Sequence, residues 1–84
     1  MRYSVEILRV AQKQLSKIDQ PNRKRIIDAI RDLAVNPRPS GCRKLSGRPA
    51  WRIRLGPYRV IYEIRDARLL VVVIVVGDRK NVYR

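Results

Sequence analysis

The stretch that decides the fold is residues 51–77, WRIRLGPYRVIYEIRDARLLVVVIVVG, which reads as three successive β-strands. It opens with Trp51, Ile53 and Leu55, which alternate with two arginines. Because successive side chains of a strand point to opposite faces, this alternation predicts one apolar and one basic face.

Gly56 and Pro57 break the first strand, and a second is expected over residues 58–65. A turn at residues 66–67 then leads into a third strand over 68–77. This last strand is apolar on both faces, so we expect it inside the sheet with both edges paired.

The N-terminal half predicts one strand and a helical hairpin. Residues 2–8 alternate between apolar and polar, as a half-buried strand does. Apolar residues then recur at intervals of three and four, which predicts an amphipathic helix. This first helix should end near Asp19, because Pro21 disfavours helical backbone in the residue before it. Pro21 suits the first turn of a second helix, which the Pro- and Gly-rich segment 36–41 ends. The expected buried stripes are Leu8, Ala11, Leu15 and Ile18, then Ile26, Ile27, Ile30, Leu33 and Ala34.

The predicted fold class is α+β, in the order β-α-α-β-β-β, with the helical hairpin packed on one face of a largely antiparallel sheet. A chain of 84 residues has room for one domain, spanning 1–84.

Composition excludes several kinds of chemistry. The chain has no histidine, so Ser-His-Asp and Cys-His catalysis are absent, and its one cysteine, Cys42, cannot form an internal disulfide. We expect no metal and no cofactor. The longest apolar run, 69–76, is too short to span a bilayer, so the default expectation is a cytoplasmic protein without a membrane partner.

The charge indicates a polyanionic partner. The formal net charge is +13, and residues 33–62 contain seven basic residues and no acidic one. Arginine outnumbers lysine 15 to 5, which suits phosphate binding because a guanidinium can hold two oxygens at once. By alternation, one basic sheet surface could be lined by Arg52, Arg54, Arg59, Arg79 and Tyr83. The alternative is a set of scattered, solvated arginines, with the tyrosine of the tail packed on the sheet.

The sequence resembles the RelE/ParE toxin superfamily of type II toxin–antitoxin systems, and within it the RelE-like branch. The resemblance covers nearly the whole chain, through Tyr3-Ser-Val, Arg43-Lys-Leu-Ser-Gly, Trp51-Arg-Ile-Arg-Leu, Tyr58-Arg-Val-Ile-Tyr-Glu-Ile, Val76-Gly-Asp-Arg and Val82-Tyr.

The resemblance implies a microbial-ribonuclease-like sheet and a ribosome-dependent mRNA endoribonuclease that cleaves mRNA in the ribosomal A site without a metal. It also implies inhibition by an acidic RelB-like antitoxin, and operator DNA binding only through the toxin–antitoxin complex. The catalytic set it implies is Arg52, Arg54, Arg59, Arg79 and Tyr83. Neighbouring basic residues are expected to bind RNA: Arg43, Lys44, Arg48 and Lys80.

The general base stays open between Tyr83 and a carboxylate such as Glu63. Trp51 and Tyr62 are expected in the core by alternation, although they could instead stack on a base. Two other functions remain: a ParE-like inhibitor of DNA gyrase, and a nucleic-acid-binding module without catalysis.

Overall fold

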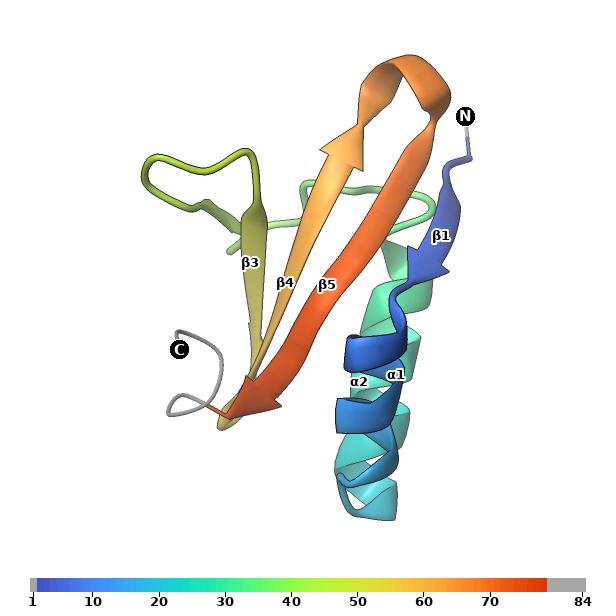
Figure 1. The fold of residues 1–84 in the computed structure, drawn as a ribbon, viewed down its shortest axis with the longest axis vertical. Helices are drawn as coiled ribbons and strands as arrows, with labels where there is room; N and C mark the ends of the chain where they lie inside the picture. The colour runs from blue at the N-terminus through green and yellow to red at the C-terminus, as the bar shows by residue number, and fades with distance from the viewer. Residues whose placement is uncertain (1, 79–84) are drawn as a thin grey trace.

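A five-stranded sheet in the order β1-β5-β4-β3-β2 organises the molecule (Figure 1). The computed structural model describes residues 2–78. Strands β1 and β5 run parallel to each other, and the other three neighbouring pairs are antiparallel. The sheet is therefore largely antiparallel, as predicted. The strands are β1 (Ser4–Ile7), β2 (Arg43–Lys44), β3 (Trp51–Leu55), β4 (Tyr58–Arg65) and β5 (Leu70–Asp78).

Helices α1 (Arg9–Ser16) and α2 (Gln20–Asp32) form the predicted hairpin beside the sheet (Figure 1). Asp19 is the N-cap of α2 and Pro21 lies in its first turn, where a missing backbone N–H does no harm. The first helix ends at Ser16, before the predicted Asp19. The main core joins the two helices to the strands through Ala11, Leu15, Ile26, Ile30, Leu33, Ile53, Val60, Tyr62, Val71, Val73 and Val76.

Two details differ from the prediction. A short strand, β2, pairs with β3 at residues for which no strand was predicted, so the order is β-α-α-β-β-β-β. Leu8, placed in the buried stripe, is instead 40% exposed, because it is the N-cap of α1 and its backbone is extended rather than helical.

A β-bulge interrupts the pairing between β4 and β5. Ile61 pairs with Val75 and Tyr62 with Val73, so Ile74 is an extra residue on β5. Tyr62 lies in the helix-covered core, and Ile61 belongs to a second, smaller cluster on the other side of the sheet. We call that other side the open face, because the helices do not cover it.

Candidate phosphate-binding face

Four arginines share the open face at the β2–β3–β4 end of the sheet. Arg43 on β2 lies opposite Arg52 on β3, and Arg54 on β3 lies opposite Arg59 on β4. Opposite residues of an antiparallel pair point to the same side, and so do residues two apart on one strand. We call Arg43, Arg52, Arg54 and Arg59 the arginine face. The register therefore puts Arg52, Arg54 and Arg59 on one face, as the alternation in the sequence predicts.

Arg59 is buried, which the sequence did not predict. It is 7% exposed, and its Nε has no hydrogen-bond partner among residues 2–78. Its neighbour on β5 is Gly77, which has no side chain to fill the adjacent position. A buried N–H group without a hydrogen-bond partner is costly, and an anion that accepted this hydrogen bond would lower that cost.

The other members differ in exposure. Arg54 is exposed and Arg52 is half-buried. Exposure therefore changes from one strand to the next, because Arg59 on β4 is buried while Arg54, opposite it on β3, is open to solvent. The remaining residues of the expected catalytic and RNA-binding sets, Arg79, Lys80 and Tyr83, lie outside the described residues.

An apolar cluster borders the arginine face. Leu45 and Ala50, from the connection between β2 and β3, pack on Ile61 and Val75 of the open face. On β4, Ile61 of this cluster lies between Arg59 and Glu63, and it is opposite Arg52 on β3. Along this face the sheet therefore changes from basic to apolar within a few residues.

Glu63, one candidate for the general base, lies beyond that cluster. It is on the open face opposite Val72, and its Oε1 accepts a hydrogen bond of 2.8 Å from Arg65. Glu63 is four positions after Arg59 on β4, about 13 Å along the strand. A general base must come within hydrogen-bond reach of the reacting proton, directly or through one water. Glu63 is therefore not among the residues that the register brings next to Arg59.

Lys44 is not on the arginine face by register, and Arg48 lies in the connection between β2 and β3. Lys44 lies opposite Trp51, whose position belongs to the helix-covered side, and its Nζ donates a 3.3 Å hydrogen bond to the Arg48 carbonyl. Both residues belong to the exposed connection around β2. Trp51 and Tyr62 pack in or against the main core, as alternation predicted.

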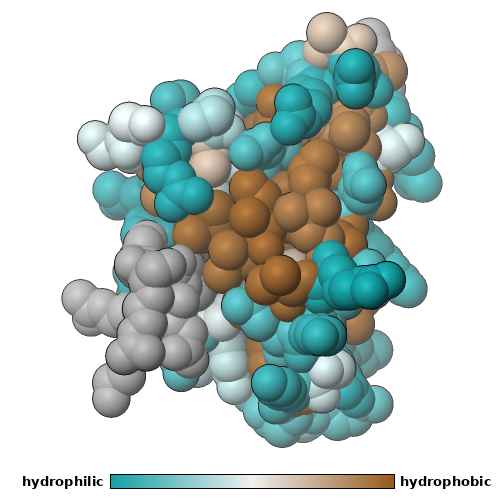
Figure 2. All heavy atoms as spheres, in the orientation of Figure 1, coloured by the Kyte–Doolittle hydropathy of each residue, from teal (hydrophilic) through white to brown (hydrophobic). Residues whose placement is uncertain are grey.

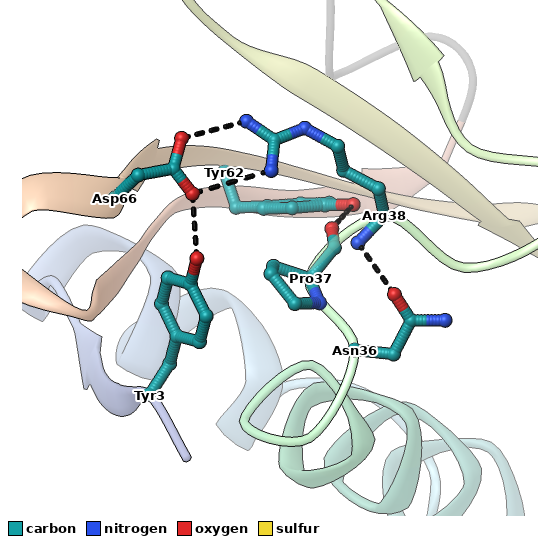
Figure 3. A network of polar contacts seen from close by, with 6 residues as sticks. All are labelled: Tyr3, Asn36, Pro37, Arg38, Tyr62 and Asp66. Carbon is teal, nitrogen blue, oxygen red and sulfur yellow. Dashed lines mark hydrogen bonds and ion pairs between the residues drawn. The ribbon is translucent and has the colours of Figure 1, made fainter. Parts of the chain in front are cut away.

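The segment that leads to Arg43 is anchored by a polar network (Figure 3). Arg38 forms two hydrogen bonds to Asp66, the shorter at 2.9 Å, and its guanidinium lies 5.1 Å from the centre of the Trp51 ring. Tyr3 donates a 2.6 Å hydrogen bond to the same carboxylate. One carboxylate therefore ties the residue before β1, the α2–β2 connection and the β4–β5 turn together.

A second, buried bond holds the same segment. The Tyr62 hydroxyl donates a 2.7 Å hydrogen bond to the Pro37 carbonyl (Figure 3). Burial raises the pKa of Tyr62, and the neighbouring Cys42 adds to the rise, so this hydroxyl keeps its proton. Together with Arg38 it fixes the chain a few residues before Arg43.

The network also shifts the pKa values of its exposed members. Hydrogen bonds from Arg38 and then Tyr3 lower the pKa of Asp66 to about 2. The hydrogen bond to Asp66 raises the pKa of Tyr3. With these shifts, the Asp66 carboxyl stays charged and the Tyr3 hydroxyl keeps its proton near neutral pH.

A different part of the surface is apolar. Figure 2 shows brown side chains gathered over β5 and the start of α1. Leu8 and Val10 are 40% and 60% exposed, and Leu8 lines a hollow together with Leu70, Val72 and Ile74. The sequence analysis did not identify this patch, because it combines residues from separate strands and a helix.

Within residues 2–78, no helix is long and apolar enough to cross a membrane. The same residues contain no group of three or more Cys, Asp or Glu side chains placed to hold a metal ion.

Comparison with solved structures shows the same fold in toxins of toxin–antitoxin pairs. The toxin of the archaeal RelE–RelB complex from Pyrococcus horikoshii is 26% identical, with a TM-score of 0.85, covering 96% of this chain and 99% of that one. The isolated RelE toxin of E. coli is 29% identical, with a TM-score of 0.79, covering 96% and 90%. The RelBE2 complex from Mycobacterium tuberculosis, 24% identical with a TM-score of 0.84, covers 96% and 95% and shares the fold.

No curated protein matches the chain. Residues 5–83 match the model of the ParE toxin of the type II toxin–antitoxin system parDE. The match covers nearly the whole chain, and the fold agrees with that of the RelE toxins. The chain is therefore a type II toxin and belongs to the ParE toxin family, within the RelE/ParE superfamily.

Proposed function

We propose that this toxin is a RelE-like, ribosome-dependent endoribonuclease that cleaves mRNA in the A site. The observation that carries the proposal is Arg59, buried and without a partner for its Nε among the described residues, directly opposite Arg54. Two guanidinium groups in that position favour a bound phosphate, because like charges on opposite strand positions otherwise repel each other.

The proposed chemistry is attack of the 2′-hydroxyl on the adjacent phosphate. Arg52, Arg54 and Arg59 stabilise the extra negative charge of the pentavalent phosphorane, which is often the largest catalytic contribution. Tyr83 is the proposed base for the proton of the 2′-hydroxyl, because guanidinium groups close to a tyrosine favour its ionised form. As the bond between phosphorus and the 5′-oxygen breaks, Arg79 stabilises the leaving oxygen and a water held by the ribosome supplies its proton. The products are a 2′,3′-cyclic phosphate and a 5′-hydroxyl. The position of Glu63, about 13 Å from Arg59 along β4, leaves Tyr83 as the better proposed base.

The proposed dependence on the ribosome follows from the geometry of the reaction, which the arginines alone do not impose on the RNA. They hold phosphate charge, but in-line attack also requires the 2′-hydroxyl and the leaving oxygen on opposite sides of the phosphorus. A ribosome that holds the mRNA in that geometry supplies the proximity term.

Primer extension on mRNA programmed into ribosomes tests the proposal. The wild type should produce a discrete break at the A site, Tyr83→Phe should lose it, and ribosome-free mRNA should stay intact. Tyr58→Phe is a matched control, because Tyr58 packs against the main core rather than lying on the arginine face. If folded wild-type protein leaves the ribosome-bound mRNA intact, the nuclease proposal is wrong.

A second function is favoured by the family model, whose description names ParE. In this alternative the toxin inhibits DNA gyrase and performs no RNA chemistry. A gyrase supercoiling assay separates the two: inhibition by the wild type that persists in Tyr83→Phe supports the ParE-like function. A nucleic-acid-binding module would show neither cleavage nor inhibition.

We further propose that an acidic RelB-like antitoxin neutralises this toxin in the cytoplasm, and that operator DNA is bound only by their complex. The similar structures include RelE toxins bound to RelB antitoxins, and the +13 charge favours an acidic chain. The exposed apolar patch over β5 also favours a partner with an amphipathic segment (Figure 2). Co-purification of the genomic neighbour, with loss of toxicity on co-expression, would test this.

A further inference from the structure

Strand β2 is too short to hold its own place in the sheet. It has two residues, Arg43 and Lys44, and it pairs with one neighbour, β3, at the edge of the sheet. Two residues form few ladder hydrogen bonds, and segments with few such bonds and few contacts open most easily. The position of Arg43 therefore depends on what holds the chain before and after β2.

After β2, the chain is held by the connection to β3. The Leu45 N–H donates a 2.8 Å hydrogen bond to the Ala50 carbonyl, and both side chains belong to the small cluster on the open face. This anchor fixes the end of β2 that follows Lys44. The other end depends on residues 37–42.

Before β2, the hydroxyl of Tyr62 holds the chain at Pro37. Tyr62 is 0% exposed, and its hydroxyl donates the buried 2.7 Å hydrogen bond to the Pro37 carbonyl (Figure 3). From there a tight turn leads to β2, in which the Cys42 N–H donates a 3.0 Å hydrogen bond to the Pro39 carbonyl. Cys42 packs against the main core, and Arg43 is the next residue.

A second anchor holds the residue next to Pro37. The guanidinium of Arg38 forms hydrogen bonds of 2.9 and 3.2 Å to the Asp66 carboxylate, and it lies 5.1 Å from the centre of the Trp51 ring. Trp51 is the β3 residue opposite Lys44, so this anchor also lies close to β2. Two consecutive residues of the connection are therefore fixed, by β4 and by the turn that follows it.

The Tyr62 anchor lies on the other side of the sheet from the arginine face. Tyr62 is opposite Trp51, and both pack in or against the main core beneath the helices. Arg43 lies opposite Arg52, on the open face. The Tyr62 hydroxyl therefore cannot touch RNA bound on the arginine face, and any effect that it has on RNA binding must pass through residues 37–42.

We propose that Tyr62 and Asp66 are positioning residues for RNA binding by Arg43. They hold Pro37 and Arg38, and through these two residues they fix the start of β2. This inference rests on the proposed RNA-cleaving function, in which Arg43 binds RNA, and deepens it. Because a positioning residue acts through another side chain, its effect on RNA affinity should vanish once Arg43 is removed.

A double-mutant cycle on RNA affinity tests the proposal. The probe is a 2′-O-methyl oligoribonucleotide, which cannot be cleaved, and the variants are Tyr62→Phe, Arg43→Ala and the double variant. Arg43→Ala should weaken binding about tenfold, as the loss of charge-assisted hydrogen bonds does. Tyr62→Phe should weaken it about fivefold when Arg43 is present and by less than about twofold when it is absent. Tyr58→Phe, opposite Leu55 at the far end of β4, is the matched control and should bind as the wild type does.

The ribosome assay gives a second readout. Tyr62→Phe should raise the KM for ribosome-bound mRNA about fivefold and leave kcat within about twofold, because the hydroxyl supports binding and takes no part in the reaction. A loss of stability alone would lower the amount of folded enzyme, and therefore kcat, at an unchanged KM. Circular dichroism melting curves establish that each variant is folded at the assay temperature.

Asp66→Ala takes the place of Tyr62→Phe if the latter does not fold. It removes the anchor of Arg38 at an exposed position and makes the protein more positive, which by itself would tighten RNA binding. Weaker binding in the presence of Arg43, and no weakening in the Arg43→Ala background, would support the proposal.

The remaining outcomes overturn it. If the folded Tyr62 or Asp66 variant loses no affinity, or loses equally with and without Arg43, these residues do not position Arg43. If Arg43→Ala binds the probe as tightly as the wild type, Arg43 does not bind RNA and the positioning role is wrong with it. Cleavage is measured separately, so a wild type that cleaves mRNA without this coupling refutes only the positioning role. Coupling without cleavage leaves the positioning role and overturns the proposed enzyme.

Discussion

At the scale of single residues, Asp66 joins three segments through one side chain, since its carboxylate accepts hydrogen bonds from Tyr3 and Arg38. Its pKa is lowered from 3.8 to about 2 in the fold. A carboxyl whose pKa is lower in the folded than in the unfolded state stabilises the fold above its unfolded pKa. That contribution is lost as the pH falls through the folded value.

We therefore expect Asp66→Asn to be less stable than the wild type near neutral pH, and the difference to shrink between pH 4 and pH 2. Urea unfolding at a series of pH values measures it. Asp28→Asn, at an exposed position of α2, should show no such convergence. A difference that stays constant down to pH 2 would mean that the carboxylate charge is not the cause.

The buried Arg59 should lower the free energy of unfolding of this protein. Its burial without a partner for Nε costs free energy, so Arg59→Met, which keeps much of the side-chain volume, should raise the free energy of unfolding by about 1 kcal/mol or more. RNA binding should fall in the same variant. Arg54→Met, at an exposed position, should change stability by about 0.5 kcal/mol or less. Thermal melting of both variants checks this, and a destabilised Arg59→Met would contradict it.

At the scale of elements, the helical hairpin is held to the sheet by a few buried side chains. Ile30 of α2 is 2% exposed within the main core, whereas Val35, just beyond the helix, is 62% exposed. Ile30→Ala should therefore lower the free energy of unfolding by about 2–5 kcal/mol. Val35→Ala should change it by about 0.5 kcal/mol or less. Chemical denaturation of the two variants measures the contrast, and equal losses would refute this account of the helix packing.

The elements also mark how far the sequence predicts the structure. Alternation over 51–65 gave β3 and β4 and put Arg52 and Arg54 on one face, because the pleat is a local property. The two-residue strand β2 has no period to detect, and the parallel pairing of β1 with β5 depends on contacts between distant segments. The burial of Arg59 beside Gly77 and the pairing of Arg43 with Arg52 depend on register, which the sequence pattern alone did not determine.

At the scale of the whole molecule, the positive charge is large for the size of the fold. A net charge of +13 is carried by a molecule whose Cα radius of gyration is 11.9 Å. The Debye length is about 10 Å at 0.1 M salt and about 3 Å at 1 M. Charges across the molecule therefore repel each other at low salt and are screened from each other at high salt.

Salt should consequently raise the stability of the free toxin while it weakens the binding of RNA. Between 0.05 and 1 M sodium chloride, at constant pH, we expect the Tm of the free chain to rise by several degrees, because screening relieves self-repulsion in the folded state more than in the expanded unfolded chain. A variant with Arg9→Gln, Lys24→Gln and Arg31→Gln, all exposed on the helices, should have a higher Tm at low salt and a smaller rise. The same salt range should lower RNA affinity through counterion release. A Tm that is flat or falls with salt would mean that self-repulsion does not limit this fold, and that the positive charge is carried at little cost in stability.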